Sequence, residues 1–388
     1  MTSFRLYAYF TIIVLILIIF YCLILSGIDP YPLLPTHATR DPGKHETYSI
    51  PQRRKISSRK EKEYVDYKSN PRLYEVKQSL VHDIRSFKSH LVGHLMHEEK
   101  VFASKKAMHA DEVGDRDSTR VNRLHKQLVC KIPFQGMDPS FPGIVQHGVY
   151  RVLPAKKLGS LIQSLTGASR SRSCGLVSSA ASLSGSLNGR VIDSHDIVLR
   201  FNGAPVDNDT IPDTGTRTTI RILNSQFFTS DSFDITDTRY DGQILILWDN
   251  FTSGNEPDAS QLYRMYVNHR DNYPDVRMYI LNPIAVRQAV RILVKSSTNR
   301  LPSQIEPSSG FIGLLLLVRF CSTVTAYELI PSIRMSTRCR YYGRQETPFN
   351  CMFSGSRASE KLFALRMNHA SDYNVIVRGR SDYAGCVT

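Results

Sequence analysis

The sequence predicts an α/β fold with a mixed, largely parallel sheet flanked by helices. One observation is a series of apolar runs, several of them short, β-branched and bounded by Gly, Pro, Asn or Asp, as buried strands are: CGLVSSAASL, DIVLRF, TTIRIL, QILILWD, VRMYILNP, FIGLLLLVRF and YNVIVRG. The other is that helical patterns at 285–295, 310–320 and 359–368 alternate with the strand-like runs. This alternation is typical of a Rossmann-like sheet, in which a nucleotide would bind beyond the carboxyl ends of the strands.

The composition supports a large globular core. The chain has 388 residues, of which 41% are hydrophobic, and this excludes wholesale disorder. At about 150 residues per domain, the length corresponds to two or three units if every segment is globular. The 49 Lys and Arg outnumber the 35 Asp and Glu, for a net charge of +14. Part of this excess is a basic run at 53–55. We interpret it as solvated charge on a tether that does not meet DNA, and we therefore expect no nucleic-acid partner.

The amino terminus predicts a membrane anchor. Residues 6–25 carry no charge, and as a helix they match the bilayer's hydrocarbon thickness of about 30 Å. A cleaved signal peptide is the alternative, but its apolar region is only about 7–15 residues long. Arg5 precedes the run, and no basic residue follows it before Arg40. We therefore expect residues 1–5 in the cytosol and the rest of the chain in a lumen.

Residues 26–125 are predicted to form a luminal stem. Their first part, 26–70, is rich in Pro and charged residues, which is the composition of a tether. An amphipathic helix is predicted at 73–96, where apolar residues recur at steps of three and four: Leu80, Ile84, Phe87, Leu91 and Leu95. This helix can pack on the main domain or self-associate, which would give a homo-oligomer. Three of its histidines have a spacing compatible with a metal site, although a polar helix edge explains them as well: His90, His94 and His97.

Cysteine usage fits an oxidising compartment. Cys22 lies in the predicted anchor, which leaves six luminal cysteines, an even number suited to three disulfides. Their spacing leaves all fifteen connectivities open. No CxxC pair occurs, so we expect no zinc site. Two acceptor sequons for N-linked glycans, at Asn208 and Asn250, agree with luminal exposure.

One strand-to-helix turn has the chemistry of a phosphate site. In Cys174–Leu183 an apolar strand runs into small residues and then a helix, so backbone N–H groups and Ser hydroxyls can approach an anion. Tight packing of small residues is the alternative. The stretches that follow, 196–205, 215–226, 307–321 and 327–332, are more specific. They resemble the large and small sialyl motifs of the animal sialyltransferases, glycosyltransferase family 29.

The resemblance covers roughly Cys130 to Cys386 and implies a fold and a function. The words RFNGAP and PSSG are most similar to the β-galactoside α2,6 branch. Residues 126–388 would form a catalytic domain with a variant of the glycosyltransferase A fold. The domain would transfer sialic acid from CMP-sialic acid to position 6 of a terminal galactose on N-acetyllactosamine-type glycoprotein glycans, with inversion and without a metal or other cofactor. The protein would be a single-pass type II protein of the Golgi membrane.

The same resemblance implies site residues and disulfides. Donor contacts fall on Ser179, Asn202, Asn224, Ser308, Ser309 and Gly310. For the two Asn residues, the alternative is that they only tie strand ends to loops. Acceptor contacts fall on Gln226 and Asp258. The implied disulfides are Cys174–Cys321, Cys339–Cys351 and Cys130–Cys386.

A metal-binding pattern is present but is interpreted differently. Asp207-Asn208-Asp209 spells the Asp-x-Asp signature of metal-dependent transferases. Because Asn208 opens a sequon, we expect these residues to form an exposed turn. A leaving CMP carries one phosphate, which backbone dipoles, hydroxyls and a cation can stabilise. We therefore predict no metal site.

The third family motif departs from the usual pattern. It normally opens with His or Tyr, and here it reads Arg340-Tyr341-Tyr342-Gly343. We expect the Arg340 guanidinium to face the donor phosphate, because it makes a charge-assisted contact that a neutral ring cannot make. Tyr341 and Tyr342 are its candidate catalytic neighbours. A surface Arg beside a disulfide is the alternative.

The last family motif lacks its general base. That motif places a His a few residues before a Glu; Glu360 matches the Glu, but Gly355–Arg357 contains no His. His369 lies nearby as a candidate substitute, and His195 of the large motif is expected to be structural. The base is therefore unassigned, and a catalytically silent relative that binds a CMP-sugar or a glycan is the alternative function.

Overall fold

The structure is a computed structural model of the chain. It describes residues 71–106, 128–134, 148–165, 172–250, 257–297, 301, 305–334, 338–343 and 356–387. All of these belong to the compact unit Asp66–Thr388, and the chain's other unit is Met1–Val65. The predicted tail 1–5 and anchor 6–25 lie outside the described residues. Within the described ranges, no helix has the length and apolar character needed to cross a bilayer.

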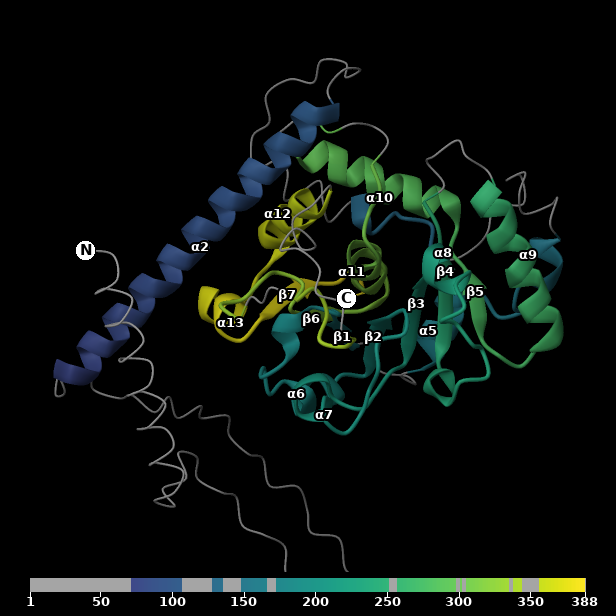
Figure 1. The fold of residues 1–388 in the computed structure, drawn as a ribbon, viewed down its shortest axis with the longest axis horizontal. Helices are drawn as coiled ribbons and strands as arrows, with labels where there is room; N and C mark the ends of the chain where they lie inside the picture. Colours follow the sequence, from purple (N-terminus) through teal and green to yellow (C-terminus); the bar gives the residue numbers. More distant parts are fainter. Residues whose placement is uncertain are drawn as a thin grey trace, which may run out of the picture. The chain divides into compact units, whose positions relative to one another are not determined.

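A seven-stranded sheet forms the centre of the second unit (Figure 1). Its strands are β1 (Ser173–Val177), β2 (Ile197–Phe201), β3 (Ile220–Asn224), β4 (Ile244–Trp248), β5 (Met278–Ile280), β6 (Thr323–Tyr327) and β7 (Arg380–Ala384). They are ordered β5-β4-β3-β2-β1-β6-β7, and every neighbouring pair is parallel except β6 with β7. The predicted mixed, mostly parallel sheet is confirmed.

Helices cover both faces of this sheet (Figure 1). The helices of the described residues are α2 (Pro71–Lys106), α5 (Leu158–Ser164), α6 (Gly189–Asp193), α7 (Ile211–Thr214), α8 (Ser225–Phe228), α9 (Pro257–Asn272), α10 (Pro283–Ser296), α11 (Ser309–Phe320), α12 (Arg357–Met367) and α13 (Asp372–Ile376), with 3-10 turns η2 (Val149–Val152), η3 (Ala181–Leu183) and η4 (Thr238–Tyr240). The main core joins one face of the sheet to α5, α10, α11 and α12. On the opposite face, one cluster includes α8 and α9, and a smaller one includes Val198 and Tyr341.

One predicted strand is wrong. The run YNVIVRG forms α13 and a turn, and β7 follows it from Arg380. Two features favour the helix: Ser371 caps it by accepting a hydrogen bond from the Asn374 N–H at 3.3 Å, and Val375 and Ile376 are buried one turn into it. The run FIGLLLLVRF lies in α11, as the helical pattern at 310–320 predicts.

The amphipathic helix of the predicted stem packs on the main domain. Helix α2 contacts α12 and α13, and Ile84, Leu91 and Leu95 of its apolar stripe are buried. A Lys88–Asp372 ion pair of 2.7 Å joins it to α13. The helix therefore packs on the main domain, which is one of the two alternatives predicted for it.

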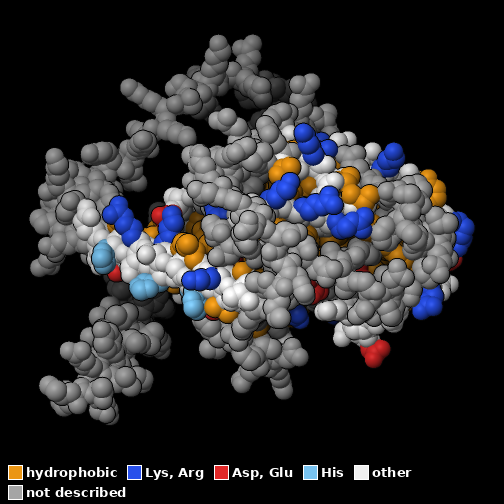
Figure 2. Space-filling view, turned by 90° about the horizontal axis from the view of Figure 1, so that it is seen from above, with side chains coloured by type: hydrophobic (Ala, Val, Ile, Leu, Met, Phe, Trp, Pro, Cys, Tyr) orange, Lys and Arg blue, Asp and Glu red, His pale blue; other side chains and the backbone are white. Residues whose placement is uncertain are grey.

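The histidines of α2 do not form a metal cluster. Among the described residues, no group of three or more His, Cys, Asp or Glu is placed to hold a metal ion. Figure 2 shows histidine side chains spaced apart along one edge of the molecule. The interpretation as a polar helix edge agrees with the exposure of His90 and His97.

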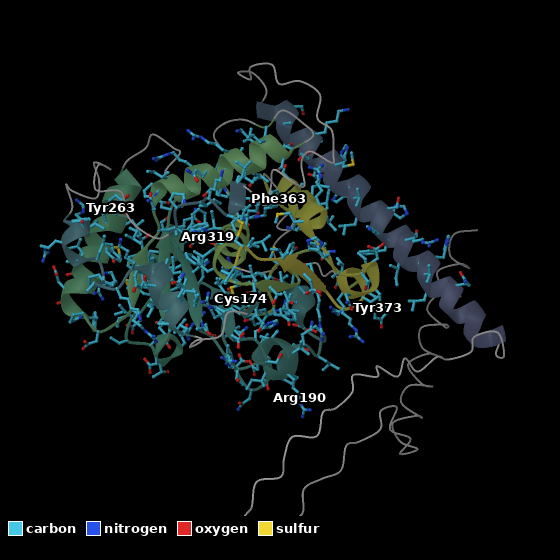
Figure 3. All side chains as sticks on the ribbon, turned by 180° about the vertical axis from the view of Figure 1, so that it is seen from behind. Cys174, Arg190, Tyr263, Arg319, Phe363 and Tyr373 are labelled. Carbon is cyan, nitrogen blue, oxygen red and sulfur yellow. A yellow bond between two sulfur atoms is a disulfide. The ribbon has the colours of Figure 1, made fainter. Side chains whose placement is uncertain are left out.

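Two of the three implied disulfides are present. Cys174 pairs with Cys321 across 147 residues, and Cys130 pairs with Cys386 across 256 residues. Cys174 lies in the interior of the domain (Figure 3), and neither it nor Cys321 is exposed. Cys339 is also disulfide-bonded, whereas Cys351 lies outside the described residues.

Candidate active site at the carboxyl ends of the strands

The predicted donor residues gather at one edge of the sheet. Because β1 to β4 are parallel neighbours, their carboxyl ends lie side by side. Ser179 comes two residues after β1, Asn202 directly follows β2, and Asn224 ends β3. Trp248, which ends β4, is the register partner of Asn224. Four adjacent strand ends therefore present polar or aromatic side chains to one place.

The two Asn residues are tied to each other and to the backbone. Asn202 has a left-handed backbone with φ of 45°, and its Oδ1 accepts a hydrogen bond from the Asn224 N–H at 3.0 Å. Asn224 Oδ1 accepts from the Phe227 N–H at 2.9 Å and so caps α8. Both side-chain oxygens thus hold strand ends to loops, and the amide Nδ2 groups are the donors that a ligand would meet.

A buried arginine on β3 fixes the loop that carries Asn202. Arg221 is 1% exposed, and its Nη1 donates to the carbonyls of Asn202 at 2.7 Å and Ala204 at 3.0 Å. Its Nε donates to Gln243 Oε1 at 2.9 Å. Burial lowers the pKa of Arg221, with the neighbouring Tyr240 acting in the opposite direction.

A second buried arginine, on β2, holds the segment that leads from the end of α7 to β3. Arg200 is fully buried and donates to the carbonyls of Thr214 and Arg217 and to the Thr218 hydroxyl. Burial lowers its pKa to about 10, so the guanidinium stays protonated at neutral pH. Sequence analysis did not single out either arginine. The available signal was a charged residue inside each of the strand-like runs DIVLRF and TTIRIL.

The amino terminus of α11 lies at the same edge. Ser309 Oγ accepts a hydrogen bond from Trp248 Nε1 at 3.0 Å, which places this serine at the end of β4. Ser308 caps α11 by accepting from the Phe311 N–H at 3.1 Å. A Cβ on Gly310 would make only ordinary contact with Leu329 and Ser308, so close backbone packing does not explain this glycine.

The segment with Arg340 runs beside the turn after β1. Arg340 forms an isolated bridge with Ala180, and the Tyr341 N–H donates to the Ser179 carbonyl at 3.1 Å. The Tyr341 hydroxyl donates to the Pro205 carbonyl at 2.8 Å, and burial raises its pKa to about 12. Arg340 is exposed, with its guanidinium carbon 5.8 Å from the centre of the Tyr342 ring. All three candidate catalytic residues of this motif therefore lie next to Ser179.

The order in which the chain adds strands to the sheet reverses between the parallel neighbours β1 and β6. The Ser178 N–H donates to the Tyr327 carbonyl at 3.1 Å, and Ser178 Oγ donates to the Glu328 carbonyl at 3.0 Å. The Glu328 side chain is 4% exposed and accepts from Ser182 Oγ at 2.6 Å and Ser332 Oγ at 2.9 Å, besides an ion pair with Arg334. Such a switch point is where open α/β sheets bind ligands.

Replacing Gly379 with alanine is expected to destabilise the switch point by about 3 kcal/mol. Gly379 has φ of +64°, and an added Cβ would lie 1.8 Å from Glu328 Oε1. That oxygen cannot move freely, because Ser332 and Arg334 hold it. Gly242 is the matched control, since it has φ of +67° and no atom within 4 Å of the added Cβ. Chemical unfolding should show a cost of only about 1 kcal/mol for Gly242→Ala, and equal costs would contradict the argument.

The remaining predicted site residues are Gln226, Asp258 and His369. Gln226 is exposed in α8, two residues after Asn224. Asp258 belongs to α9, but its side chain lies outside the described residues. His369 is exposed, and its N–H donates to the Asp382 carbonyl on β7 at 2.8 Å. Both β6 and β7 therefore separate His369 from β1, and the structure does not bring it to the four strand ends.

His195 is buried and the Asp-x-Asp sequence lies in an exposed turn, as expected for these two segments. His195 is buried, and its Nε2 lies 2.8 Å from the Tyr327 hydroxyl. Burial lowers the pKa of this imidazole, which favours its neutral form. Asp207 Oδ1 accepts from the Thr210 N–H at 3.1 Å in an exposed turn that includes Asn208. Asn250 is half-buried, and the rest of its sequon lies outside the described residues.

The base position of the last motif is only partly described. Gly355 lies outside the described residues, Ser356 is buried, and the exposed Arg357 opens α12. Glu360, in the first turn of α12, reaches the amino terminus of α11, where its carboxylate accepts hydrogen bonds from Ser308. This contact joins the small motif to the last motif.

Comparison with known proteins identifies the family. The model of glycosyltransferase family 29 (sialyltransferase) matches residues 131–358. The chain is 33% identical over 231 residues to beta-galactoside alpha-2,6-sialyltransferase 2 of Bos taurus, which is 57% of this chain and 45% of that protein. It is 35% identical over 222 residues to beta-galactoside alpha-2,6-sialyltransferase 1 of Mus musculus, which is 55% of this chain and 54% of that protein. The matched part of the chain thus spans about half the length of these relatives.

A solved structure is also similar. The crystal structure of a mammalian sialyltransferase aligns over 66% of this chain and 84% of its own, with 15% sequence identity and a TM-score of 0.41. The assignment itself depends on the family model, which covers more than half of the sequence. The chain therefore belongs to glycosyltransferase family 29, the sialyltransferases.

Proposed function

We propose that the protein transfers sialic acid from CMP-sialic acid to position 6 of a terminal galactose on N-acetyllactosamine-type glycoprotein glycans. The names of the curated relatives support the α2,6 linkage and the β-galactoside acceptor. The observation that carries the proposal is the gathering of Ser179, Asn202, Asn224 and Ser309 at adjacent strand ends, with the exposed Arg340 beside them.

The proposed chemistry is a single inverting displacement. The acceptor hydroxyl attacks the anomeric carbon as the bond to the CMP phosphate breaks, and the phosphate keeps the electron pair. Arg340 and the hydroxyls near Ser309 would stabilise the negative charge that grows on the phosphate, so no metal would be needed. Gln226 and Asp258 would hold the galactose.

We further propose that the protein is anchored in the Golgi membrane through residues 6–25, with residues 1–5 in the cytosol. The stem, residues 26–125, would then include α2, and residues 126–388 would form the catalytic domain with a variant of the glycosyltransferase A fold. The long uncharged run at 6–25 and the even number of cysteines after it support this topology. Homo-oligomerisation remains a prediction.

A catalytically silent CMP-sugar or glycan-binding protein is the second candidate. It is favoured by the lack of a His in Gly355–Arg357 and by the position of His369 at the outer edge of β7. In this case the donor residues would bind nucleotide without turnover.

The deciding experiment measures transfer and donor binding together. The detergent-solubilised full chain is incubated with labelled CMP-sialic acid and N-acetyllactosamine, with and without EDTA, while calorimetry measures CMP affinity. A fragment such as 120–388 is unsuitable because it lacks α2, which packs on α12. Transfer that survives EDTA supports the proposal. Binding without transfer supports the silent candidate, and a folded protein that does neither contradicts both.

Replacing Arg340 with alanine is expected to raise the apparent KM for the donor about tenfold, because the charge-assisted contact to the phosphate is lost. Arg338 is the matched control: it is also exposed, lies two residues away and donates to the Gly343 carbonyl at 2.9 Å. Arg338→Ala should leave the donor KM within about twofold of the parent protein. Steady-state kinetics with varied CMP-sialic acid provides the test, and equal values for the two variants would refute the role of Arg340.

A further inference from the structure

The carboxylate of Glu360 is buried and is held by neutral groups. The residue is 6% exposed. Its Oε1 accepts a hydrogen bond from the Ser308 N–H at 2.8 Å and lies 3.0 Å from Ser356 Oγ, and its Oε2 accepts from Ser308 Oγ at 2.5 Å. A proton can reach this buried carboxylate through the hydrogen-bonded Ser308 hydroxyl.

Counting only its contacts with described residues, the Ser308 hydroxyl has one acceptor position left. A serine hydroxyl donates one hydrogen bond and accepts two. Ser308 donates to Glu360 and accepts from the Phe311 N–H at 3.1 Å, which leaves one lone pair for a further donor. Ser308 is half-buried and precedes Ser309, which contacts Trp248 at the end of β4. Ser308 therefore joins the start of α11, next to the site residue Ser309, to a carboxylate that solvent scarcely reaches.

A cavity of about 30 Å³ adjoins this pair. It is lined by Ser308, Phe311, Leu314, Leu329, Glu360, Lys361 and Ala364. Its volume is sufficient for a water molecule. The facing side chains of α11 and of the segment after β6 are apolar, and the charged groups come from α12 itself.

The charged groups on α12 beside Glu360 are Lys361 and Arg357. Burial lowers the pKa of Lys361 to about 8, with Glu360 raising it and Arg357 lowering it further. Glu306, in the segment before α11, contributes only its carbonyl, which accepts from Ser356 Oγ at 2.5 Å.

From this geometry we infer that Ser308 and Glu360 form the proton relay of the transfer reaction. The inference rests on the proposed function. As the acceptor oxygen forms its bond to the anomeric carbon, its proton passes to Ser308 Oγ, and the Ser308 proton passes to Glu360 Oε2. The CMP phosphate leaves with the electron pair of the broken bond. Ser308 is then a catalytic residue, Glu360 acts through it, and the relay takes the place of the histidine that Gly355–Arg357 lacks.

The test compares three variants of the detergent-solubilised full chain by kcat against pH. Glu360→Gln keeps the shape of the side chain but cannot take the proton, so kcat should fall on the order of 10²–10⁴-fold. The kcat of the parent protein is measured across the pH range, and any acid limb that Glu360 produces should be absent from E360Q. Ser308→Ala should lose a similar factor, whereas Ser308→Thr keeps both the hydroxyl and the helix cap and should recover most of the rate.

Ser356→Ala is the matched control. It removes a hydroxyl from the same carboxylate but leaves Ser308 in place, so it should keep kcat within about threefold and preserve the acid limb. Calorimetry with CMP and thermal unfolding establish that each variant folds and binds nucleotide.

The outcomes separate the relay from the proposed function. If the parent protein transfers sialic acid and E360Q keeps both its kcat and its acid limb, the relay is wrong and the proposed function stands. If S356A loses as much activity as S308A, the network is structural and the relay is wrong. If the parent protein binds CMP without any transfer, both the proposed function and the relay fail.

Discussion

Replacing Arg221 with methionine is expected to lower the free energy of unfolding by about 3 kcal/mol and to weaken CMP binding about tenfold. Arg221 is 1% exposed, and methionine keeps most of the apolar bulk of its side chain. The change removes the hydrogen bonds that Arg221 donates to the carbonyls of Asn202 and Ala204. Buried carbonyls without a partner cost about 1–3 kcal/mol each. The loop that presents Asn202 to the donor loses its attachment to β3 at the same time.

Arg239 is the matched control for this prediction. It also contacts the Tyr240 ring, and it donates to the Gly203 carbonyl at 3.2 Å, between the two carbonyls that Arg221 holds. It is exposed, however, and pairs with Asp237 at the surface. Arg239→Met should therefore cost under about 1 kcal/mol in denaturant unfolding and leave CMP affinity nearly unchanged. A similar loss in both variants would mean that Arg221 has no special role.

Removing the Cys174–Cys321 disulfide is expected to have a large effect on stability. The pair closes a loop of 147 residues, and the chain-entropy treatment of such a loop gives about 5 kcal/mol. Both sulfurs are in the core, where Cys174 lies at the start of β1 and Cys321 directly follows α11. The double variant Cys174→Ala, Cys321→Ala should melt far below the parent protein, by about 10 °C or more in calorimetry.

The Cys130–Cys386 pair provides the comparison. Its loop is longer, at 256 residues, so loop entropy alone predicts a loss at least as large. It joins a segment outside the sheet to the residues after β7, whereas Cys174 belongs to β1, the strand before Ser179. We therefore expect both double variants to melt early but only the Cys174, Cys321 variant to lose CMP affinity. Unchanged melting of either variant would contradict the entropy argument.

Local sequence pattern was sufficient for most of the fold. Runs such as QILILWD and TTIRIL gave β4 and β3, because short β-branched segments between turn residues have few alternatives to a buried strand. YNVIVRG has the same apolar content but follows a capping Ser371, and burial against the main core favours the helix. The antiparallel strand β7, with the sequence RSDYA, has too few apolar residues to stand out.

The candidate site was predictable only where one motif supplies one strand end. Asn202 and Asn224 follow apolar runs directly, so their common location could be expected from the order of parallel strands. Ser308 and Glu360 are 52 residues apart, and no local spacing reveals that their side chains meet. Most of the acceptors of Arg200 and Arg221 are backbone carbonyls, which carry no sequence signature at all.

If residues 6–25 anchor the chain as proposed, the packing of α2 on α12 restricts where a protease can release it in soluble form. Leu91 and Leu95 would lose their partners if the chain were cut after Lys106, and the face of α12 that α2 covers would meet water. That helix carries Glu360. A secreted form that keeps its activity is therefore expected to begin before Pro71, and cleavage closer to the domain should shed an unstable product.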